Sequence, residues 1–292
     1  MTIRLENVSF RYTQGIEGFF GQEQILQNIS FRIDSGEFVG IVGPSGSGKT
    51  TLIQHFNGLL KPVSGRVLID HKDITGQKKI PGNIRKKIGI VFQFPELQFF
   101  ENTVYDEVSY GPRNLKIPGN EIEKRVREAF DLLELDFEDF RDRAPFHLSE
   151  GQKRRVAIAS ILVMKPEVLI FDEPTAGMDF RGVLRLKSFI RSLKNSGRTV
   201  ILVSHDMAFI AETVDRILCL KNGQLIFDGT KIDFFSDVPI LQKANLREPE
   251  IVRLARALRQ ENIPVPFSIT DLRGMKRFLE ARLKSENSFK IR

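Results

Sequence analysis

Cysteine is almost absent from the 292-residue sequence, and the single thiol, Cys219, has no partner for an intramolecular disulfide. That usage fits a reducing cytosol. Its apolar neighbours Ile217, Leu218 and Leu220 predict a buried strand thiol with no reactive role.

Long apolar runs are also missing. None reaches the roughly 18 residues that a transmembrane helix requires, so we expect a chain that does not span a bilayer. Residues 1–10 alternate apolar and polar side chains as a strand does, and they lack the hydrophobic region of a signal peptide. Without internal repeats or low-complexity tracts, and with 41% apolar and 28% charged residues, the composition predicts one large or two modest globular domains.

Positive charge is only mildly in excess, because 44 Lys and Arg stand against 37 Asp and Glu, giving +7. The basic residues are interspersed with acids rather than clustered, which makes nucleic-acid binding the weaker interpretation. A polyanionic small ligand or a nearby anionic membrane face would explain the excess as well.

A phosphate-binding loop follows a short buried strand expected over residues 36–42. The stretch GPSGSGKTT has the spacing G-x-x-x-x-G-K-[ST] between a strand and a helix, which is the context that identifies a P-loop. Its glycines let backbone N–H groups turn inward, and the following helix N-terminus favours anions. Lys49 should reach the β- and γ-phosphates, and the Thr50 hydroxyl should bind Mg²⁺. The expected nucleotide-binding residues are Gly43, Pro44, Ser45, Gly46, Ser47, Gly48, Lys49, Thr50 and Thr51.

Two acids end an apolar run over residues 167–172 that predicts a central parallel strand. Asp172 emerges at the carboxyl end, where ligands of open α/β sheets bind, so we expect it at the Mg²⁺ site. Glu173 should point the other way if the strand persists, and it can polarise a water that attacks the γ-phosphate in line. Two surface acids are the alternative, which the P-loop makes the weaker one.

A similar strand over residues 199–206 carries His205 near its end. We expect this side chain to hydrogen-bond the γ-phosphate or the attacking water, although a lone histidine is more often structural. His55, His71 and His147 lack such a position, and we expect them to be structural or exposed.

Together with these motifs, the stretch LSEGQ at residues 148–152 resembles the ATP-binding cassette (ABC) ATPases, and the likeness extends over residues 1 to about 230. LSEGQ is similar to the family signature LSGGQ, with Glu150 in place of the usual glycine. The resemblance implies an α/β P-loop NTPase with a RecA-like parallel-sheet core, an N-terminal antiparallel β-subdomain and an inserted α-helical subdomain. It also implies ATP and Mg²⁺ as cofactors.

Further site residues follow from the resemblance alone. Gln93 matches the Q-loop glutamine, whose amide meets Mg²⁺ and the water, and Asp179 ends AGMD, which matches the D-loop. Tyr12 matches the aromatic that stacks on adenine, an interaction worth roughly 1–3 kcal/mol; a packed strand aromatic is the alternative. In the family, the signature closes over the γ-phosphate held by the other subunit's P-loop, which assigns that role here to Ser149, Gly151 and Gln152. Two ATP molecules would thus join a head-to-tail dimer that hydrolysis releases.

A helical subdomain is predicted over residues 95–165, of the kind that receives a helix from a membrane subunit in transporters. We expect Asn120 to cap a helix and Glu123 to pair with Arg127. The apolar face of that helix comprises Ile122, Val126, Ala129, Phe130 and Leu133.

Residues 94–114 also resemble a subset of the family, the ATPases of energy-coupling factor (ECF) transporters, including cobalt-type uptake systems. A mixture of core and groove lining is expected for Phe94, Leu97, Phe99 and Phe100.

The chain is expected to divide into an ABC ATPase domain, residues 1–232, and a C-terminal helical extension, residues 233–292. Ile251, Leu254, Ala255 and Leu258 mark one face of a first helix in the extension. Thr270 is the expected cap of a second helix, which carries Leu272, Met275, Leu279 and Leu283. The tail resembles that of ECF ATPases, where it helps to hold two subunits together; a simple packing extension is the alternative.

These expectations combine into the ATP-hydrolysing subunit of an ECF-type importer for vitamins or transition-metal ions, peripheral on the cytoplasmic face of the membrane. The implied partners are a second ABC ATPase subunit, identical or paralogous, a transmembrane coupling subunit and a substrate-binding membrane subunit, with no nucleic acid. The alternative is a soluble ABC ATPase that acts on nucleic acid, ribosomes or an assembly complex. The loop segment Glu17–Gln22 receives no role.

Overall fold

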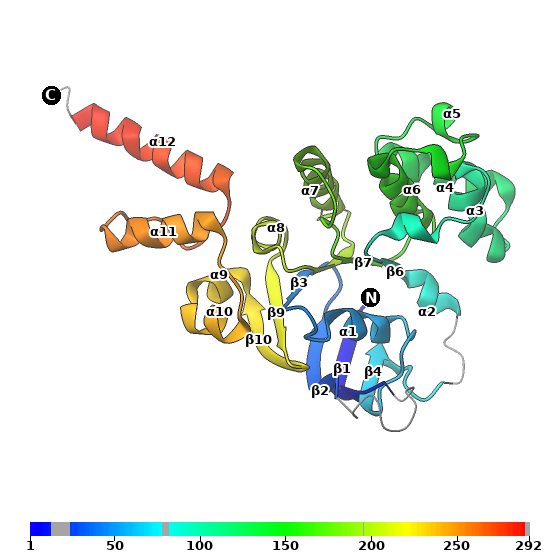
Figure 1. The fold of residues 1–292 in the computed structure, drawn as a ribbon, viewed down its shortest axis with the longest axis horizontal. Helices are drawn as coiled ribbons and strands as arrows, with labels where there is room; N and C mark the ends of the chain where they lie inside the picture. Colours follow the sequence, from blue (N-terminus) through cyan, green and yellow to red (C-terminus); the bar gives the residue numbers. More distant parts are fainter. Residues whose placement is uncertain (13–23, 78–81, 195, 290–292) are drawn as a thin grey trace.

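A computed structural model describes residues 1–12, 24–77, 82–194 and 196–289 (Figure 1). The segment Glu17–Gln22 lies outside these residues. The described chain forms a four-stranded and a six-stranded sheet, with a group of helices beside the larger sheet and further helices at the C-terminal end.

The smaller sheet is antiparallel, in the order β2-β1-β4-β5. Apolar side chains alternate along β2, so one face packs on the core while the other meets solvent. The strands are β1 (Ile3–Phe10), β2 (Leu26–Ile33), β4 (Ser64–Ile69) and β5 (Lys72–Asp73).

The larger sheet has the order β10-β9-β3-β8-β7-β6, and all its neighbouring strands pair in parallel except β9 and β10. Its central strands are apolar throughout because both faces are covered. One face packs on the smaller sheet and on helix α1, and the other on α6, α7 and α8. The strands are β3 (Phe38–Val42), β6 (Ile88–Val91), β7 (Val168–Asp172), β8 (Thr199–Val203), β9 (Arg216–Lys221) and β10 (Gln224–Thr230), and the helices are α1 (Lys49–Phe56), α7 (Phe180–Lys194) and α8 (Met207–Thr213).

The helical group lies between β6 and β7 in the sequence and packs beside α7 (Figure 1). All five residues of the predicted apolar face are buried, and Arg127 pairs with Glu123 at 2.8 Å. The predicted Asn120 cap is wrong: the helix begins at Gly119, and the cap position is Pro118, whose carbonyl accepts the first helical N–H groups. The elements here are α2 (Gly82–Lys87), before β6, then η1 (Pro95–Gln98), α3 (Val104–Asn114), α4 (Gly119–Leu132), α5 (Phe137–Phe140), η2 (Pro145–His147) and α6 (Glu150–Leu162).

The C-terminal helices form two pairs. The first pair, α9 (Lys231–Ser236) and α10 (Val238–Ala244), buries Phe234, Phe235 and Leu241 in the main core. The second pair, α11 (Glu250–Gln260) and α12 (Leu272–Phe289), shares a small cluster built around Ala255, Val265 and Met275.

One helix cap in this region differs from the prediction. The buried hydroxyl of Thr270 donates to the Ala211 carbonyl at 3.1 Å, which ties the extension to α8. The cap belongs to Asp271, whose carboxylate accepts from the Gly274 N–H at 2.7 Å. A carboxylate at this position also suits the positive helix end, so Asp271 takes the capping role expected of Thr270.

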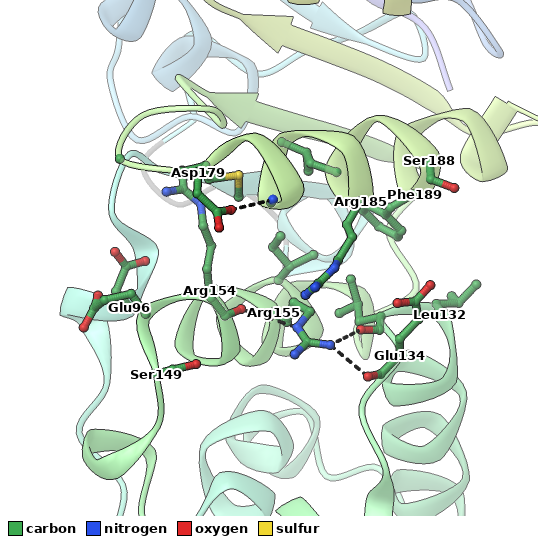
Figure 2. A pocket seen from close by; sticks show the side chains of 18 of the residues that line it. Glu96, Leu132, Glu134, Ser149, Arg154, Arg155, Asp179, Arg185, Ser188 and Phe189 are labelled. Carbon is green, nitrogen blue, oxygen red and sulfur yellow. Dashed lines mark hydrogen bonds between the residues drawn. The ribbon is translucent and has the colours of Figure 1, made fainter.

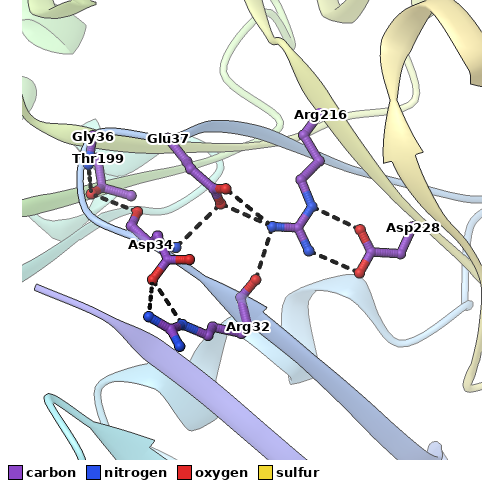
Figure 3. Close-up of polar contacts among 7 residues, drawn as sticks. All are labelled: Arg32, Asp34, Gly36, Glu37, Thr199, Arg216 and Asp228. Carbon is purple, nitrogen blue, oxygen red and sulfur yellow. Dashed lines mark hydrogen bonds and ion pairs between the residues drawn. The ribbon is translucent and has the colours of Figure 1, made fainter.

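An arginine joins the two sheets (Figure 3). Arg216 on β9 makes a two-pronged ion pair with Asp228 on β10, at 2.7 and 2.8 Å, and a second pair with Glu37 at 2.9 Å. It also donates to the backbone carbonyl of Arg32 on β2 at 2.9 Å. This set of bonds fixes β2 and the start of β3 relative to β9 and β10.

Within the described residues, no helix combines the length and apolar character needed to cross a membrane.

Candidate functional site

The P-loop connects the end of β3 to the start of α1, and its shape requires glycine at two positions. A Cβ on Gly43 would lie 2.1 Å from the Leu220 carbonyl oxygen. A Cβ on Gly48, which has a φ of +95°, would lie 2.8 Å from a Leu26 methyl group and 2.9 Å from the Ile25 carbonyl oxygen. The loop is therefore pressed against β9 and β2, and its backbone can adopt this conformation only without side chains there.

The ammonium group of Lys49 lies within the loop that it follows. Its Nζ donates to the carbonyl oxygens of Gly43 and Pro44 at 2.8 and 2.9 Å, which leaves one of its three N–H groups for another acceptor. Burial lowers the pKa of Lys49, whereas the charges of Glu173 and Asp172 raise it. The side chain thus places a positive charge between the loop and the two acids.

Thr50 and Asp172, the two residues expected to hold Mg²⁺, are in direct contact. The Thr50 hydroxyl donates to Asp172 Oδ2 at 2.8 Å, and the second carboxylate oxygen is buried without a partner. Burial raises the pKa of Asp172, as does the charge of Glu173, while Thr50 and Lys49 lower it. The Ser47 hydroxyl is also buried without a partner. An orphaned carboxylate oxygen beside a hydroxyl fits Mg²⁺, which is commonly held by one or two carboxylates together with substrate phosphates.

Glu173 leaves the strand instead of continuing it. It follows the last residue of β7 with a φ of +47°, a left-handed conformation that ends the strand alternation. Its carboxylate is 15% exposed and lies 2.9 Å from the Nδ1 atom of His205, whose side chain is 69% exposed. Ser204, which the sequence analysis did not single out, donates to the other carboxylate oxygen at 3.1 Å. Glu173 and His205 therefore lie together at the carboxyl ends of β7 and β8.

Two further residues are expected at the nucleotide: Tyr12 lies beside Thr51 on α1, and Gln93 follows β6. The Tyr12 hydroxyl is 3.3 Å from the Thr51 hydroxyl, and its ring packs edge-on against Phe10 while remaining largely exposed. The ring is thus packed on one side, as the alternative of a packed strand aromatic expects, and stacking of its open side on adenine stays a prediction. Gln93 is exposed two residues past the end of β6, the strand next to β7.

The signature residues belong to a different part of the chain (Figure 2). Ser149 caps α6: its hydroxyl accepts from the Gln152 N–H at 3.4 Å, and the Gln152 side chain accepts from the Ser149 N–H at 3.0 Å. Gly151 is exposed, and no atom lies within 4 Å of a Cβ built on it. Across the gap, Asp179 accepts from the Gly182 N–H at the start of α7 at 2.7 Å.

Ser149, Gly151 and Asp179 line one cavity of about 760 Å³ between α6 and α7, and no P-loop residue lines it. The structure therefore gathers the predicted residues into two groups. The P-loop group of residues comprises Lys49, Thr50, Asp172, Glu173 and His205. The signature group of residues comprises Ser149, Gly151 and Asp179.

Comparison with known proteins decides the family. The family model described as ABC transporter matches residues 26–176, just over half of the chain. The energy-coupling factor transporter ATP-binding protein EcfA2 of Clostridium tetani is 42% identical over 280 residues, which cover 96% of each chain. The chain belongs to the ABC ATPases of energy-coupling factor transporters.

Solved structures agree with this assignment. The structure of cbiO1 from Clostridium perfringens, described as part of the ABC transporter complex cbiONQ, is 39% identical with a TM-score of 0.72 and covers 87% of this ECF ATPase and 98% of its own chain. A dimeric ATP-binding cassette, MJ0796, in a post-hydrolysis state bound to ADP and phosphate, is 33% identical with a TM-score of 0.67 and covers 78% and 98%. The α/β fold of an ABC-type P-loop NTPase expected from the sequence is confirmed.

Proposed function

We propose that this ECF ATPase energises an importer by closing on ATP with a second ATPase subunit, so that each nucleotide lies between the P-loop of one chain and the signature of the other. The observation that carries the proposal is the separation of the two groups: the cavity beside the signature contains no P-loop residue. A signature without its own phosphate site gains a function when a second subunit supplies that site.

ATP and Mg²⁺ would be held by the P-loop side of the site. Inward N–H groups of the loop and the free N–H of Lys49 can bind the phosphates, and the exposed face of Tyr12 can stack on the base. Thr50, Asp172 and Gln93 are the candidates to hold Mg²⁺, which would neutralise charge on the β- and γ-phosphates.

Hydrolysis would depend on Glu173 as the base that orients and deprotonates the attacking water. Its carboxylate is held at both oxygens, by Ser204 and by His205, so its direction is fixed. The Nδ1 atom of His205 is engaged by Glu173, which leaves Nε2 as the ring atom able to meet the γ-phosphate or the water.

The second subunit would complete the site with Ser149, Gly151 and Gln152 at the N-terminus of α6, and with Asp179. A helix N-terminus favours phosphate through its free N–H groups and its dipole. ATP can drive closure only through its higher affinity for the closed dimer than for the open one.

Coupling to the membrane would use the exposed apolar residues at the start of the helical group. Phe99 is buried, whereas Phe94, Leu97 and Phe100 are exposed, with Leu97 at 81%. The Phe100 and Tyr110 rings pack edge-to-face with centroids 4.7 Å apart, which extends this surface onto α3. Such a surface fits the apolar face of a helix from a transmembrane coupling subunit on the cytoplasmic side of the membrane.

The C-terminal helices would hold the two ATPase subunits together without nucleotide. Leu254 on α11 and Leu272 and Leu283 on α12 are exposed, although the small cluster beneath them is packed. Exposed apolar side chains along one helical pair are typical of a surface that another chain covers. The partner of this surface is proposed to be the second ATPase subunit, identical or paralogous.

Vitamins or transition-metal ions are the proposed cargo, bound by a separate substrate-binding membrane subunit. Affinity purification from detergent-solubilised membranes tests the proposal directly: it should recover the chain with integral membrane proteins, in a complex whose ATPase activity responds to cargo. Recovery only with soluble proteins or RNA would support the alternative of a non-transport ABC ATPase.

A further inference from the structure

The signature helix and the turn after β7 are joined by Arg154, a buried arginine to which neither motif assigns a role. Arg154 lies on α6, five residues after Ser149, and is only 6% exposed. One guanidinium nitrogen donates to the Ala176 carbonyl at 2.7 Å, and the other donates to the Glu173 carbonyl at 3.4 Å. One side chain thus holds both ends of the turn that runs from the proposed base towards Asp179.

Besides the bonds from Arg154, this turn is held by the Glu173 N–H, which donates to the Val203 carbonyl at 2.8 Å, and by the Met178 N–H, which donates to the Thr175 carbonyl at 3.1 Å. Its backbone starts in the left-handed conformation of Glu173, and the Ala176 N–H donates to the Glu173 carbonyl at 3.1 Å. Left-handed backbone is unfavourable at a non-glycine residue, so it persists where neighbouring bonds hold it. The Arg154 guanidinium supplies two charge-assisted bonds at this point.

Arg154 carries a charge that burial disfavours. Burial lowers the pKa of Arg154, and the carboxylate of Glu96 on η1 opposes that shift. One Glu96 oxygen is buried without a hydrogen-bond partner. The signature helix and the turn after β7 therefore meet at this guanidinium, and Glu96 on the Q-loop side lines the same cavity (Figure 2).

We propose that Arg154 is a positioning residue that fixes the backbone of Glu173 and of the D-loop to the signature helix. Through it, a movement of α6 changes the direction of the Glu173 carboxylate, and the signature of each chain is mechanically linked to that chain's own base. This inference rests on the proposed role of Glu173 in hydrolysis.

The test compares Arg154→Met with Arg155→Met in the ATPase complex. Arg155 is the next residue of the same helix, but it donates to the carbonyls of Leu133 and Glu134 within the helical group. Both changes remove a guanidinium that donates to two backbone carbonyls of a neighbouring segment. We expect Arg154→Met to lower kcat by about 100-fold, because a misplacement of about 1 Å is enough for such a loss, with ATP affinity unchanged. Arg154→Lys should recover part of the rate because it restores one donor.

A double-mutant cycle with Glu173→Gln provides the readout that a purely structural role would not move. If Arg154 acts through Glu173, adding Arg154→Met to Glu173→Gln should lower kcat by less than threefold beyond the single Glu173→Gln change, because the group being positioned is already gone. The inference would be overturned if the losses in kcat of the two single variants multiply in the double variant. It would also be overturned if Arg154→Met and Arg155→Met lower kcat equally. Wild-type turnover of Glu173→Gln alone would instead refute the proposed base.

Discussion

The Oε1 atom of Glu173 lies 2.9 Å from the Nδ1 atom of His205, and the two side chains come from the ends of adjacent parallel strands. Ser204 holds the other carboxylate oxygen. This arrangement fixes an acid and an imidazole at the edge of the sheet where the P-loop also begins. It places the proposed base and its histidine partner without contact to any residue of LSEGQ.

Replacing Glu173 with Gln should retain ATP binding and slow hydrolysis by at least about 100-fold, because the amide keeps the shape of the carboxylate but cannot accept a proton. The variant should accumulate as an ATP-bound dimer, which light scattering with and without nucleotide measures. Ser204→Ala is the matched control: it removes one hydrogen bond to the carboxylate and should reduce the rate less. A variant that hydrolyses ATP near the wild-type rate would rule out Glu173 as the base.

Replacing Gly151 with Asp should abolish hydrolysis while ATP binding by single chains remains. Among the described residues, a Cβ at this position meets open space beyond its own helix, and an acid in the first turn suits the helix dipole. The loss would therefore come from repulsion of a phosphate rather than from misfolding. Gly151→Ala should keep most of the activity. Loss of ATP binding in isolated Gly151→Asp monomers would contradict a role across the dimer.

Ser149→Ala tests the same contact with a known complication. The change removes a hydroxyl proposed to meet the phosphate, with an expected loss of about 100-fold in kcat. It also removes the α6 cap, which costs about 1 kcal/mol of stability. Ser149→Asn keeps a cap but not the hydroxyl, so it should stay as inactive as Ser149→Ala with recovered thermal stability. Activity that instead follows stability across both variants would reduce Ser149 to a capping residue.

Removing the chain after Arg247 should weaken dimerisation in the absence of nucleotide. This position retains α9 and α10, which bury Phe234, Phe235 and Leu241 in the main core, and deletes α11 and α12, from which Val252 reaches that core. Leu272→Ser with Leu283→Ser in the full chain is the matched variant, because both side chains are exposed and their loss should not affect folding. Unchanged mass by light scattering for both proteins would count against the extension as a contact between subunits.

The stability of the protein should fall as the pH drops below about 6.5, partly because of His55. This residue is fully buried, its Nδ1 lies 2.7 Å from the Thr51 carbonyl oxygen, and burial lowers its pKa. A histidine that is buried in its neutral form contributes its full stabilisation above its pKa in the unfolded state. That contribution is lost as the pH falls from the unfolded-state pKa through the lower folded-state pKa. The unfolding temperature, measured between about pH 7.5 and pH 5.5, should vary less in His55→Gln than in wild type. His147→Gln, which replaces an exposed histidine, is the control and should show the wild-type change of unfolding temperature with pH. The same change in His55→Gln would refute the contribution of His55.

The sequence predicted the strands that carry the site, because central parallel strands are continuous apolar runs with distinct ends. It also predicted the face of α4, where apolar residues repeat with helical spacing. It could not predict the left-handed turn at Glu173, since its N–H donates to Val203 and its carbonyl accepts from Arg154, two residues distant in the sequence. The sequence pointed to Thr270 as a cap, but its hydroxyl contacts α8 and the capping role belongs to Asp271.

The buried arginines were the larger omission. Arg154 and Arg155 are adjacent in a basic stretch that resembles an exposed face, yet the first contacts the turn after β7 and the second the end of α4. A pattern of charges along a helix does not reveal that neighbouring elements cover them. Ser204 was also missed, because its hydrogen-bond partner Glu173 is 31 residues away in the sequence.

The cavity that signature residues line, without any P-loop residue, has a consequence for mixtures of two inactive variants. If the proposed partner is a second copy, pairing a Lys49→Ala chain with a Gly151→Asp chain places both lesions in one nucleotide site and leaves the other intact. Two preparations that are each inactive should then regain turnover when subunits exchange, a form of complementation that a self-sufficient monomer could never display.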